Sequence, residues 1–184
     1  MRKLAVIFPG IGYTCDKPLL FYAEKLAAKS GYEIKRIAYS LPGDRKIRGD
    51  KKKIEEAIRF LYADTVEKLS DVDFSQYDEI LFISKSIGTV IASAYANEHQ
   101  ESNIRHVLYT PLEDTFGYHP QNAISFLGTK DLWSIPDDVI RLAKETGVPM
   151  HVYENANHSL ETGDVLKDID ILKDVMAKTE RFIR

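Results

Sequence analysis

The residue with the strongest potential for covalent chemistry is Ser86, which follows an apolar run that predicts a buried strand. The small residues Ser84 and Gly88 flank it, and a helical segment begins directly afterwards. A serine at such a strand-to-helix turn is exposed and lies near the unpaired N–H groups of the helix. Serine is a weak nucleophile unless a base activates it and donors stabilise the oxyanion that forms. The turn therefore predicts a nucleophile, and other loops must supply its base.

Further loops that follow predicted strands carry the residue types that a nucleophilic serine needs. Asp131 lies in one of these loops and His158 in a small-residue turn of another. The first predicted strand ends in a turn that contains Gly10 and Gly12. In parallel sheets the loops after the carboxyl ends of the strands gather at one edge, where ligands bind. The sequence therefore predicts that Asp131 and His158 lie close to Ser86.

The order serine, aspartate, histidine resembles that of the α/β-hydrolase superfamily, over nearly the whole chain. The family's elbow is Gly-x-Ser-x-Gly, and this chain has Ser84 at the first position, which keeps a small side chain in the turn. Three more segments are similar to family loops: the acid loop Gly128-Thr129-Lys130-Asp131 followed by Ile135-Pro136, the histidine loop Asn155-Ala156-Asn157-His158-Ser159, and Pro9-Gly10-Ile11, where the family often has His-Gly-x. The resemblance implies an α/β fold: a three-layer α/β/α sandwich around a parallel sheet of about six strands, without a cap domain.

The resemblance also implies a role for each side chain. Ser86 would attack an acyl carbonyl, His158 would act as general base and then as general acid, and Asp131 would orient the imidazole. The expected enzyme is a small serine hydrolase, similar to carboxylesterases and thioesterases. It would cleave an ester, thioester or related acyl bond of a small-molecule substrate through an acyl-enzyme, and it would need no metal and no organic cofactor.

The oxyanion hole and the substrate pocket are expected among the loops at the same edge of the sheet. The resemblance implies that the oxyanion donors are the backbone N–H groups of Ile87 and of Ile11, with Gly12 as the alternative to Ile11. Loop aromatics often serve as satellites of the core, but an apolar acyl pocket is an equally good interpretation here. The candidate pocket residues are Tyr13, Leu112, Phe116, Tyr118, Trp133 and Leu160.

Other side chains compete for the roles of base and acid. His119 lies in a short loop that could reach the same strand edge, and it is the serious rival to His158. Asp137 and Asp138 compete with Asp131, but they are typical of the first turn of a helix, where carboxylates favour the dipole.

The other reactive side chains have simpler structural explanations. His106 and His151 fall within predicted strands, and His99 lies late on the helix after Ser86, where exposure is expected. Lys85 is interpreted as a residue of the turn without a catalytic role, and Cys15 as a small apolar packing residue.

Strand-like and helix-like segments alternate along the chain, which predicts a parallel sheet with helices on both faces. The expected strands are Leu4–Phe8, Tyr32–Tyr39, Glu79–Ile83, Ile104–Tyr109, Ala123–Leu127 and Met150–Tyr153. The expected helices are Leu19–Lys29, a long helix with an apolar stripe from Ile54 to Leu69, Val90–Ala96, Ile135–Lys144 and Val165–Ile183. The polar, basic stretch Pro42–Lys53 is expected to be a solvated loop, and Pro111–Asn122 has room for one helical turn but not for a lid.

Length and composition limit the class of protein. The chain has 184 residues, which predicts one domain spanning 1–184, and its 44% apolar and 29% charged residues are typical of a globular protein. A net charge of −3 argues against nucleic-acid binding. The apolar run at the N-terminus breaks at Pro9, too early for a signal peptide, and no other run approaches the length of a membrane span. The lone Cys15 fits a reducing compartment, so we expect a cytoplasmic protein.

Two further functions remain open at this stage. One is a hydrolase-like ligand sensor or protein-interaction module without turnover, because a fold does not fix a function. The other is a flavodoxin-like phosphate or nucleotide binder that uses Ser84, Ser86 and Thr89 at a helix N-terminus. A dinucleotide fingerprint at Gly10 and Gly12 is disfavoured because its third glycine is missing. A homodimer is compatible with the sequence.

Overall fold

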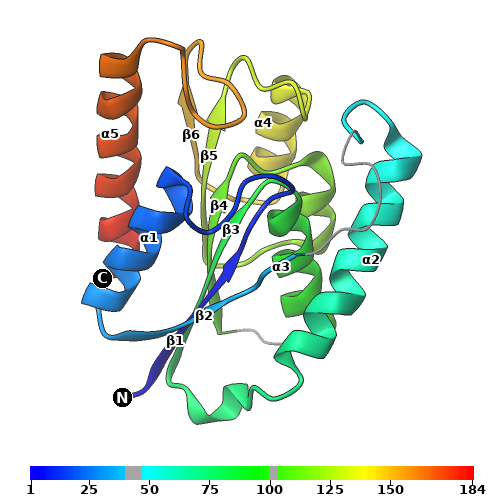
Figure 1. The fold of residues 1–184 in the computed structure, drawn as a ribbon, viewed down its shortest axis with the longest axis vertical. Coiled ribbons are helices and arrows are strands. Elements are labelled where there is room, and N and C mark those ends of the chain that lie inside the picture. The colour runs from blue at the N-terminus through cyan, green and yellow to red at the C-terminus, as the bar shows by residue number, and fades with distance from the viewer. Residues whose placement is uncertain (40–46, 100–102) are drawn as a thin grey trace.

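A computed structural model describes residues 1–39, 47–99 and 103–184. Its centre is a six-stranded, all-parallel sheet with the order β2-β1-β3-β4-β5-β6 (Figure 1). The strands are β1 (Lys3–Phe8), β2 (Tyr32–Arg36), β3 (Glu79–Lys85), β4 (Ile104–Tyr109), β5 (Ala123–Gly128) and β6 (Met150–Tyr153). The predicted parallel sheet is therefore confirmed.

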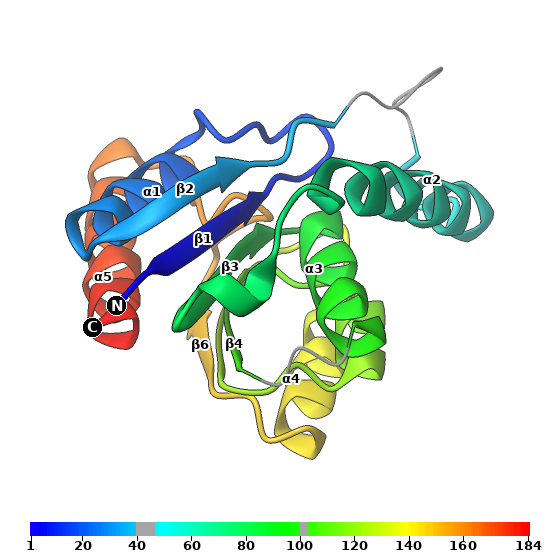
Figure 2. The same cartoon turned by 90° about the horizontal axis from the view of Figure 1, so that it is seen from below.

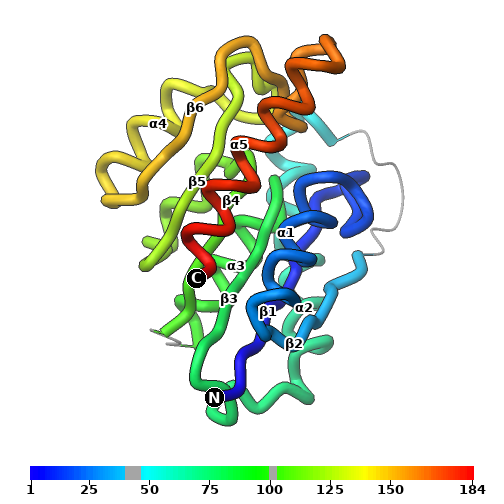
Figure 3. The backbone as a smooth tube through the Cα atoms, turned by 90° about the vertical axis from the view of Figure 1, so that its left-hand side faces the viewer, coloured from blue at the N-terminus to red at the C-terminus, as the bar shows by residue number. Residues whose placement is uncertain are grey.

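Helices cover both faces of this sheet, as Figure 2 shows. The helices are α1 (Pro18–Lys29), α2 (Lys51–Leu69), α3 (Ile87–Glu98), α4 (Pro136–Glu145) and α5 (Val165–Ile183), with short 3₁₀ helices η1 (Phe74–Gln76) and η2 (Glu113–Tyr118). On one face α1 and α5 lie side by side (Figure 3). Because both faces are covered, the central strands read as continuous apolar runs, and every β3 residue from Ile80 to Lys85 is buried.

Alternate residues of β3 enter different cores, which decides what surrounds the end of this strand. Leu81 and Ile83 pack against α1 and α5, whereas Phe82 faces α3 on the other side. Lys85 continues the first of these two rows, because side chains alternate along a strand. The last residues of β3 therefore carry a lysine toward one helical layer, and Ser86 comes immediately after the strand.

Two predicted element boundaries differ from the structure. The second strand ends at Arg36 rather than Tyr39, because β2 is an edge strand and its pairing with β1 ends there. Helix α2 begins at Lys51, inside the stretch predicted as a loop, because the Asp50 side chain accepts the Lys53 N–H (3.1 Å) and caps the helix. The part of that predicted loop at 42–46 lies outside the described residues.

The connection between β4 and β5 contains η2, a 3₁₀ helix of six residues, which is about two turns rather than the single helical turn predicted. The helix after Ser86 is longer than predicted, because α3 begins directly at Ile87 and continues to Glu98. No helix in the described parts of the chain has the length and apolar character needed to cross a membrane.

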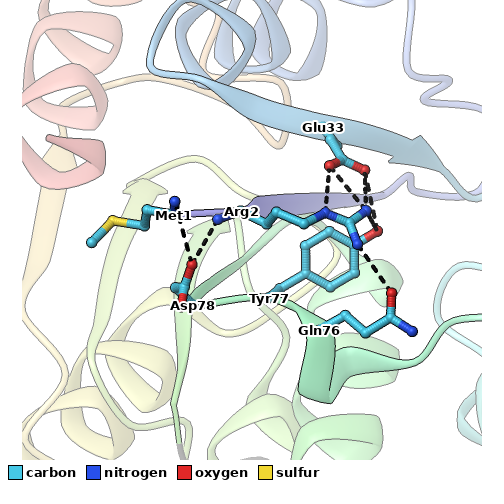
Figure 4. A network of polar contacts seen from close by, with 6 residues as sticks. All are labelled: Met1, Arg2, Glu33, Gln76, Tyr77 and Asp78. Carbon is cyan, nitrogen blue, oxygen red and sulfur yellow. Dashed lines mark hydrogen bonds and ion pairs between the residues drawn. The ribbon is translucent and has the colours of Figure 1, made fainter.

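An exposed polar network holds the amino end of the sheet together (Figure 4). The Arg2 guanidinium donates to the Glu33 carboxylate (3.1 Å) and to Gln76 (3.0 Å), and it lies 4.5 Å from the centre of the Tyr77 ring. The Arg2 N–H donates to Asp78 (2.7 Å). These contacts join the start of β1 to β2 and to the segment that leads into β3.

Candidate active site

Ser86 occupies a strained turn between β3 and α3. Its φ of 58° and ψ of −129° are unusual for a residue with a side chain, and they mark a turn held by its surroundings. The Ser86 N–H donates to the Tyr109 carbonyl of β4 (3.0 Å), and the Thr89 N–H donates to the Ser86 carbonyl (2.8 Å). These bonds hold the turn from both sides and present the hydroxyl at the carboxyl edge of the sheet.

Gly88 allows the first turn of α3 to lie directly against the end of β1. A Cβ atom at this position would lie 2.4 Å from the Pro9 carbonyl oxygen and 2.5 Å from that of Phe8. Both obstacles are backbone atoms, so no side-chain rotation could relieve the clash. The absence of a side chain at Gly88 is therefore what brings Ser86 close to the glycine-containing loop after β1.

Gly128 has the same function at the other end of the site. A Cβ there would lie 2.2 Å from the Ala156 carbonyl oxygen, so the loops after β5 and β6 can only meet at a glycine. The Lys130 N–H donates to that same carbonyl (2.9 Å), and the Asn155 N–H donates to the Thr129 hydroxyl (2.8 Å). The two loops form one hydrogen-bonded unit that places their acidic and imidazole side chains together.

Ser86, His158 and Asp131 form one chain of hydrogen bonds. The His158 Nε2 atom lies 2.7 Å from the Ser86 Oγ, and its Nδ1 atom lies 2.6 Å from the Asp131 Oδ2. The other Asp131 oxygen accepts the Trp133 N–H (2.8 Å). The Asp131 side chain is fully buried and that of His158 is 13% exposed. The structure thus joins residues 72 positions apart in the sequence.

The surroundings of His158 keep its ring neutral near neutral pH. Burial lowers the pKa of His158 to about 4, and the positive charge of Lys85 acts in the same direction. The hydrogen bond and negative charge of Asp131 oppose this shift only in part. A neutral imidazole that donates from Nδ1 to Asp131 has a free lone pair on Nε2, which can accept the Ser86 proton.

Two contacts that fix the imidazole were not found in the sequence. The Asn157 side-chain oxygen accepts the N–H groups of Ser159 (2.7 Å) and Glu161 (3.2 Å), which folds the loop around His158. The Trp133 ring stacks on the imidazole with 5.5 Å between ring centres. The turn chemistry of asparagine is a signal that sequence reasoning could have used for Asn157. The stacking of Trp133 depends on the meeting of two loops.

The three amides predicted to bind an oxyanion lie in two turns at this edge. The turn after β1 is closed by the Gly10 N–H, which donates to the Tyr13 carbonyl (3.0 Å), and Gly12 has a φ of 75°. A Cβ on Gly10 would lie 3.2 Å from the Ser86 Cβ, so the turn touches Ser86. Within the described residues, the N–H groups of Ile11, Gly12 and Ile87 donate to no protein acceptor.

The predicted pocket residues are mostly part of the core. Leu112 and Phe116 are 3% and 1% exposed, and Phe116 packs with Leu127 and Val139 under α4. Leu112 packs into the core between the sheet and α2–α3, so for these two side chains the structure favours the core interpretation over the pocket. The Thr89 and Thr115 hydroxyls form a hydrogen bond (2.7 Å) that joins η2 to the helix of the elbow.

The remaining predicted pocket residues have different surroundings. Leu160 is also buried, at 2% exposure, although one side of it lines a small cavity of about 260 Å³ beside α5. Tyr13 is buried and its hydroxyl accepts the Leu19 N–H (3.1 Å). Tyr118 packs half-buried against the α2–α3 core. Of the six predicted residues, Trp133 has a recorded contact with the Ser86–His158–Asp131 chain.

The competing residues lie elsewhere. His119 is exposed at the end of η2, and Asp137 and Asp138 lie in the first turn of α4 as their helical interpretation predicted. His106 is buried against Phe82, which agrees with a structural role.

The three hydroxyls expected in a phosphate site have other partners. Ser84 donates to the Val107 carbonyl, Thr89 to the Ser86 carbonyl, and Ser86 pairs with His158. All three hydroxyls are therefore already engaged within the protein. Among the described residues, no group of three or more acidic, histidine or cysteine side chains is arranged to hold a metal ion.

A cavity of about 340 Å³ opens between the turn after β1 and the residues that follow β2. Its apolar wall includes Ile11, Cys15 and Ile37, and Gly10 belongs both to this wall and to the contact with Ser86. Arg36 at its rim is neutralised by an ion pair with Asp16 (2.9 Å) and a second with Glu24. The sequence prediction missed this cavity because the end of β2 carries no motif.

Comparisons with known proteins bear on the fold of this chain. No family model and no curated protein matches this sequence. Solved structures do match: an esterase from Pyrococcus furiosus (TM-score 0.64, 14% identity, covering 99% of this chain and 80% of that one) and an α/β serine hydrolase without a lid from Xanthomonas campestris (TM-score 0.61, 13% identity, 98% and 82%). A third is an α/β serine hydrolase homologue from Coxiella burnetii (TM-score 0.61, 16% identity, 96% and 84%).

The chain has the α/β-hydrolase fold. In this α/β-hydrolase fold Ser86 lies at the turn between a central strand and the following helix. The loops after β5 and β6 supply the carboxylate and the imidazole that reach it. The fold resemblance seen in the sequence is therefore confirmed at the level of architecture.

Proposed function

We propose that this protein is a serine hydrolase that cleaves an ester, thioester or related acyl bond of a small substrate. The observation that carries the proposal is the unbroken chain of hydrogen bonds from Ser86 through His158 to Asp131. A buried carboxylate, an imidazole and a hydroxyl in this order are the groups that activate a serine nucleophile. We further propose that residues 1–184 act as one α/β-hydrolase domain in the cytoplasm.

The proposed reaction begins with attack by the Ser86 oxygen on the acyl carbonyl carbon. His158 Nε2 takes the hydroxyl proton as the new C–O bond forms, and Asp131 stabilises the imidazolium. The negative charge on the carbonyl oxygen is bound by the free amides of Ile87 and of Ile11 or Gly12. Collapse of the tetrahedral intermediate breaks the bond to the leaving group, which receives the proton from His158. Water, deprotonated by His158, then releases the acid from Ser86.

The cavity beside Gly10 supports a small, uncharged substrate group at this site. Its wall is largely apolar, and within the described part of its lining the cation at the rim, Arg36, is already paired with carboxylates. A charged substrate group would find no free opposite charge among these described lining residues, whereas an apolar acyl or alcohol group would bury its surface. We propose that this cavity holds the group attached to the reacting carbonyl.

The direct test is covalent labelling by a fluorophosphonate, which reacts with activated serines. We expect the wild-type protein to be labelled, and we expect Ser86→Ala to abolish labelling. Ser84→Ala is the matched control, since Ser84 is a small residue two positions away whose hydroxyl donates to the Val107 carbonyl. Folded wild-type protein that stays unlabelled would contradict the proposal, as would labelling that persists in Ser86→Ala.

A panel of nitrophenyl esters then tests turnover and the cavity together. We expect hydrolysis that depends on His158. We expect Ile37→Trp, which fills the cavity, to lower kcat/KM for bulky esters much more than for acetate esters. Equal losses for all esters would show that the cavity holds no part of the substrate. Labelling without turnover of any ester would place the protein among acyl-binding proteins or transferases.

A further inference from the structure

One buried lysine is left unexplained by the proposed mechanism. Lys85 directly precedes Ser86 and is 1% exposed. Among the described residues its ammonium group has no hydrogen-bond or ion-pair partner, and its recorded contact is with the face of the Tyr13 ring, 4.8 Å from the ring centre. Burial of an unpaired ammonium group opposes folding, so a lysine in this place needs a reason other than stability.

The side chain of Lys85 runs beneath the site rather than into the cavity. Its stem passes under the turn after β1, with its Cδ 3.4 Å from where a Cβ on Gly10 would lie. In the sheet it pairs with Tyr109 of β4, whose hydroxyl is bonded to Thr179 of α5 (2.7 Å) and so does not reach toward the ammonium. The lysine side chain therefore lies against the turn after β1, with its ammonium group over the Tyr13 ring.

The charged groups that act on Lys85 come from the loops of the active site. The carboxylates of Asp131, after β5, and Glu161, after β6, favour its charged form. Burial outweighs them and lowers the pKa of Lys85 to about 7. In return, the charge of Lys85 favours the unprotonated form of His158. A positive charge on Lys85 thus disfavours a positive charge on the His158 imidazole, and both groups interact with Asp131.

We propose that Lys85 is a positioning residue that acts on the reaction through His158, because its buried ammonium group sets how firmly the imidazole holds a proton. The inference rests on the proposed function only for its kinetic readout. While Lys85 is charged, an imidazolium beside Asp131 is disfavoured, so His158 stays ready as a base but is a weaker one. When Lys85 loses its proton, the imidazolium that forms during attack is no longer opposed, and the reaction becomes faster.

The test compares wild-type protein with Lys85→Met, which keeps the length and apolar stem of the side chain but removes the charge. We expect the NMR titration of the His158 ring to move to higher pH in the variant by roughly one unit, the size of one nearby charge at a partly buried site. We expect the acid limb of kcat/KM to move upward in pH with it. In the wild-type protein kcat/KM should rise as Lys85 loses its proton, and this rise should be absent from Lys85→Met.

Lys130→Met is the matched control for charge. Lys130 is adjacent to Asp131 in the sequence but is exposed, so solvent screens its charge and the titration of His158 should stay as in the wild type. A shift in Lys130→Met as large as that in Lys85→Met would overturn the proposal, because it would reflect general surface charge. Unchanged His158 titration and an unchanged pH profile in Lys85→Met would overturn it directly.

A second measurement covers the case in which Lys85→Met does not fold. Lys85→Gln is a polar neutral variant for the same comparison. In the wild-type protein, NMR of ¹³C-labelled lysine should show one lysine that titrates near neutrality, with a small inflection in the His158 ring signal at the same pH. The absence of such a lysine overturns the proposal.

The stability readout separates structure from catalysis. A lysine whose pKa is lower in the folded than in the unfolded protein destabilises the folded state most below its folded-state pKa. The lost stability is regained as the pH rises from the folded-state pKa to the unfolded-state pKa. Lys85→Met should therefore raise Tm at pH 6, and the difference should narrow toward pH 9. A purely structural role would give this Tm pattern without any movement of the His158 titration. Because the NMR and Tm measurements need no turnover, failure of fluorophosphonate labelling would refute the proposed function without deciding this inference.

Discussion

The two edges of the sheet each hold a polar network, and the networks differ in how far they are exposed to solvent. At the amino edge Arg2 and Glu33 form an ion pair whose side chains are 50% and 52% exposed (Figure 4). At the carboxyl edge the Asp131 and His158 side chains are 0% and 13% exposed. Water screens the first network, whereas the second lies in a poorly screened site where each charge alters the others.

This difference shows which network can carry chemistry. An exposed ion pair contributes little to stability, and losing one partner leaves the other solvated. In the buried network each partner holds another in place, so a single change propagates through Asp131, His158 and Ser86. Matched substitutions at the two edges of the sheet test this difference.

The largest effect is expected for Asp131→Asn, matched with Asp78→Asn in the exposed network. An amide has only one oxygen, and if that oxygen accepts the Trp133 N–H, its NH₂ group donates to Nδ1 and holds the imidazole in the wrong tautomer. The value of kcat/KM should therefore fall by about 10⁴-fold. Asp78→Asn should leave kcat/KM within about twofold, because its partner is the exposed Arg2 N–H. Ester hydrolysis measures both. An Asp131→Asn protein that keeps a tenth of its activity would contradict the role of the buried network.

The next effect is the pH dependence of the reaction. The pKa of His158 is lowered, so the imidazole stays unprotonated, and active as a base, to a pH below the ordinary value for histidine. The acid limb of kcat/KM should therefore lie well below pH 6.5, with about a tenfold loss for each further pH unit. A rate profile and an NMR titration of His158 check this. An acid limb above that value would mean that the site is wetter than the structure describes.

A smaller effect is expected from Gly88→Ala, which tests how the buried network is assembled. The new methyl group would meet two backbone carbonyls, so the free energy of unfolding should fall by about 2–3 kcal/mol and labelling of Ser86 should slow. Gly117→Ala is the control, since a Cβ there meets nothing within 4 Å, and we expect a change within about 0.5 kcal/mol. Urea unfolding measures both variants, and equal stability of the two would show that α3 can move away from β1.

The smallest effect is expected at the amino edge. Arg2→Gln removes the ion pair with Glu33 and should lower the free energy of unfolding by less than about 1 kcal/mol, with no change in kcat/KM. The loss should shrink in high salt, because exposed charges are screened. A loss of several kcal/mol, measured by urea unfolding at low and high salt, would show that the exposed network is more important than its solvation indicates.

The order of strands and helices was largely predictable, because strands buried on both faces and amphipathic helices leave clear patterns. β1, β3 and β5 are mostly apolar, and the apolar stripe of α5 matches its observed bounds. The errors were local. The N-terminus of α2 depends on an Asp50 cap within a basic stretch, and the end of β2 depends on its having one neighbouring strand.

By itself, the sequence determined the turn at Ser86 and the loops that carry Asp131 and His158, because small residues after buried strands are local signals. It could not determine the features that depend on how closely distant segments approach one another in the fold. The meeting of two loops at Gly128, the stacking of Trp133, the inward packing of Phe116 and the isolation of Lys85 beneath the site all follow from contacts between distant segments. Burial and charge coupling are properties of those contacts, so the lowered pKa values of His158 and Lys85 exist only in the folded protein.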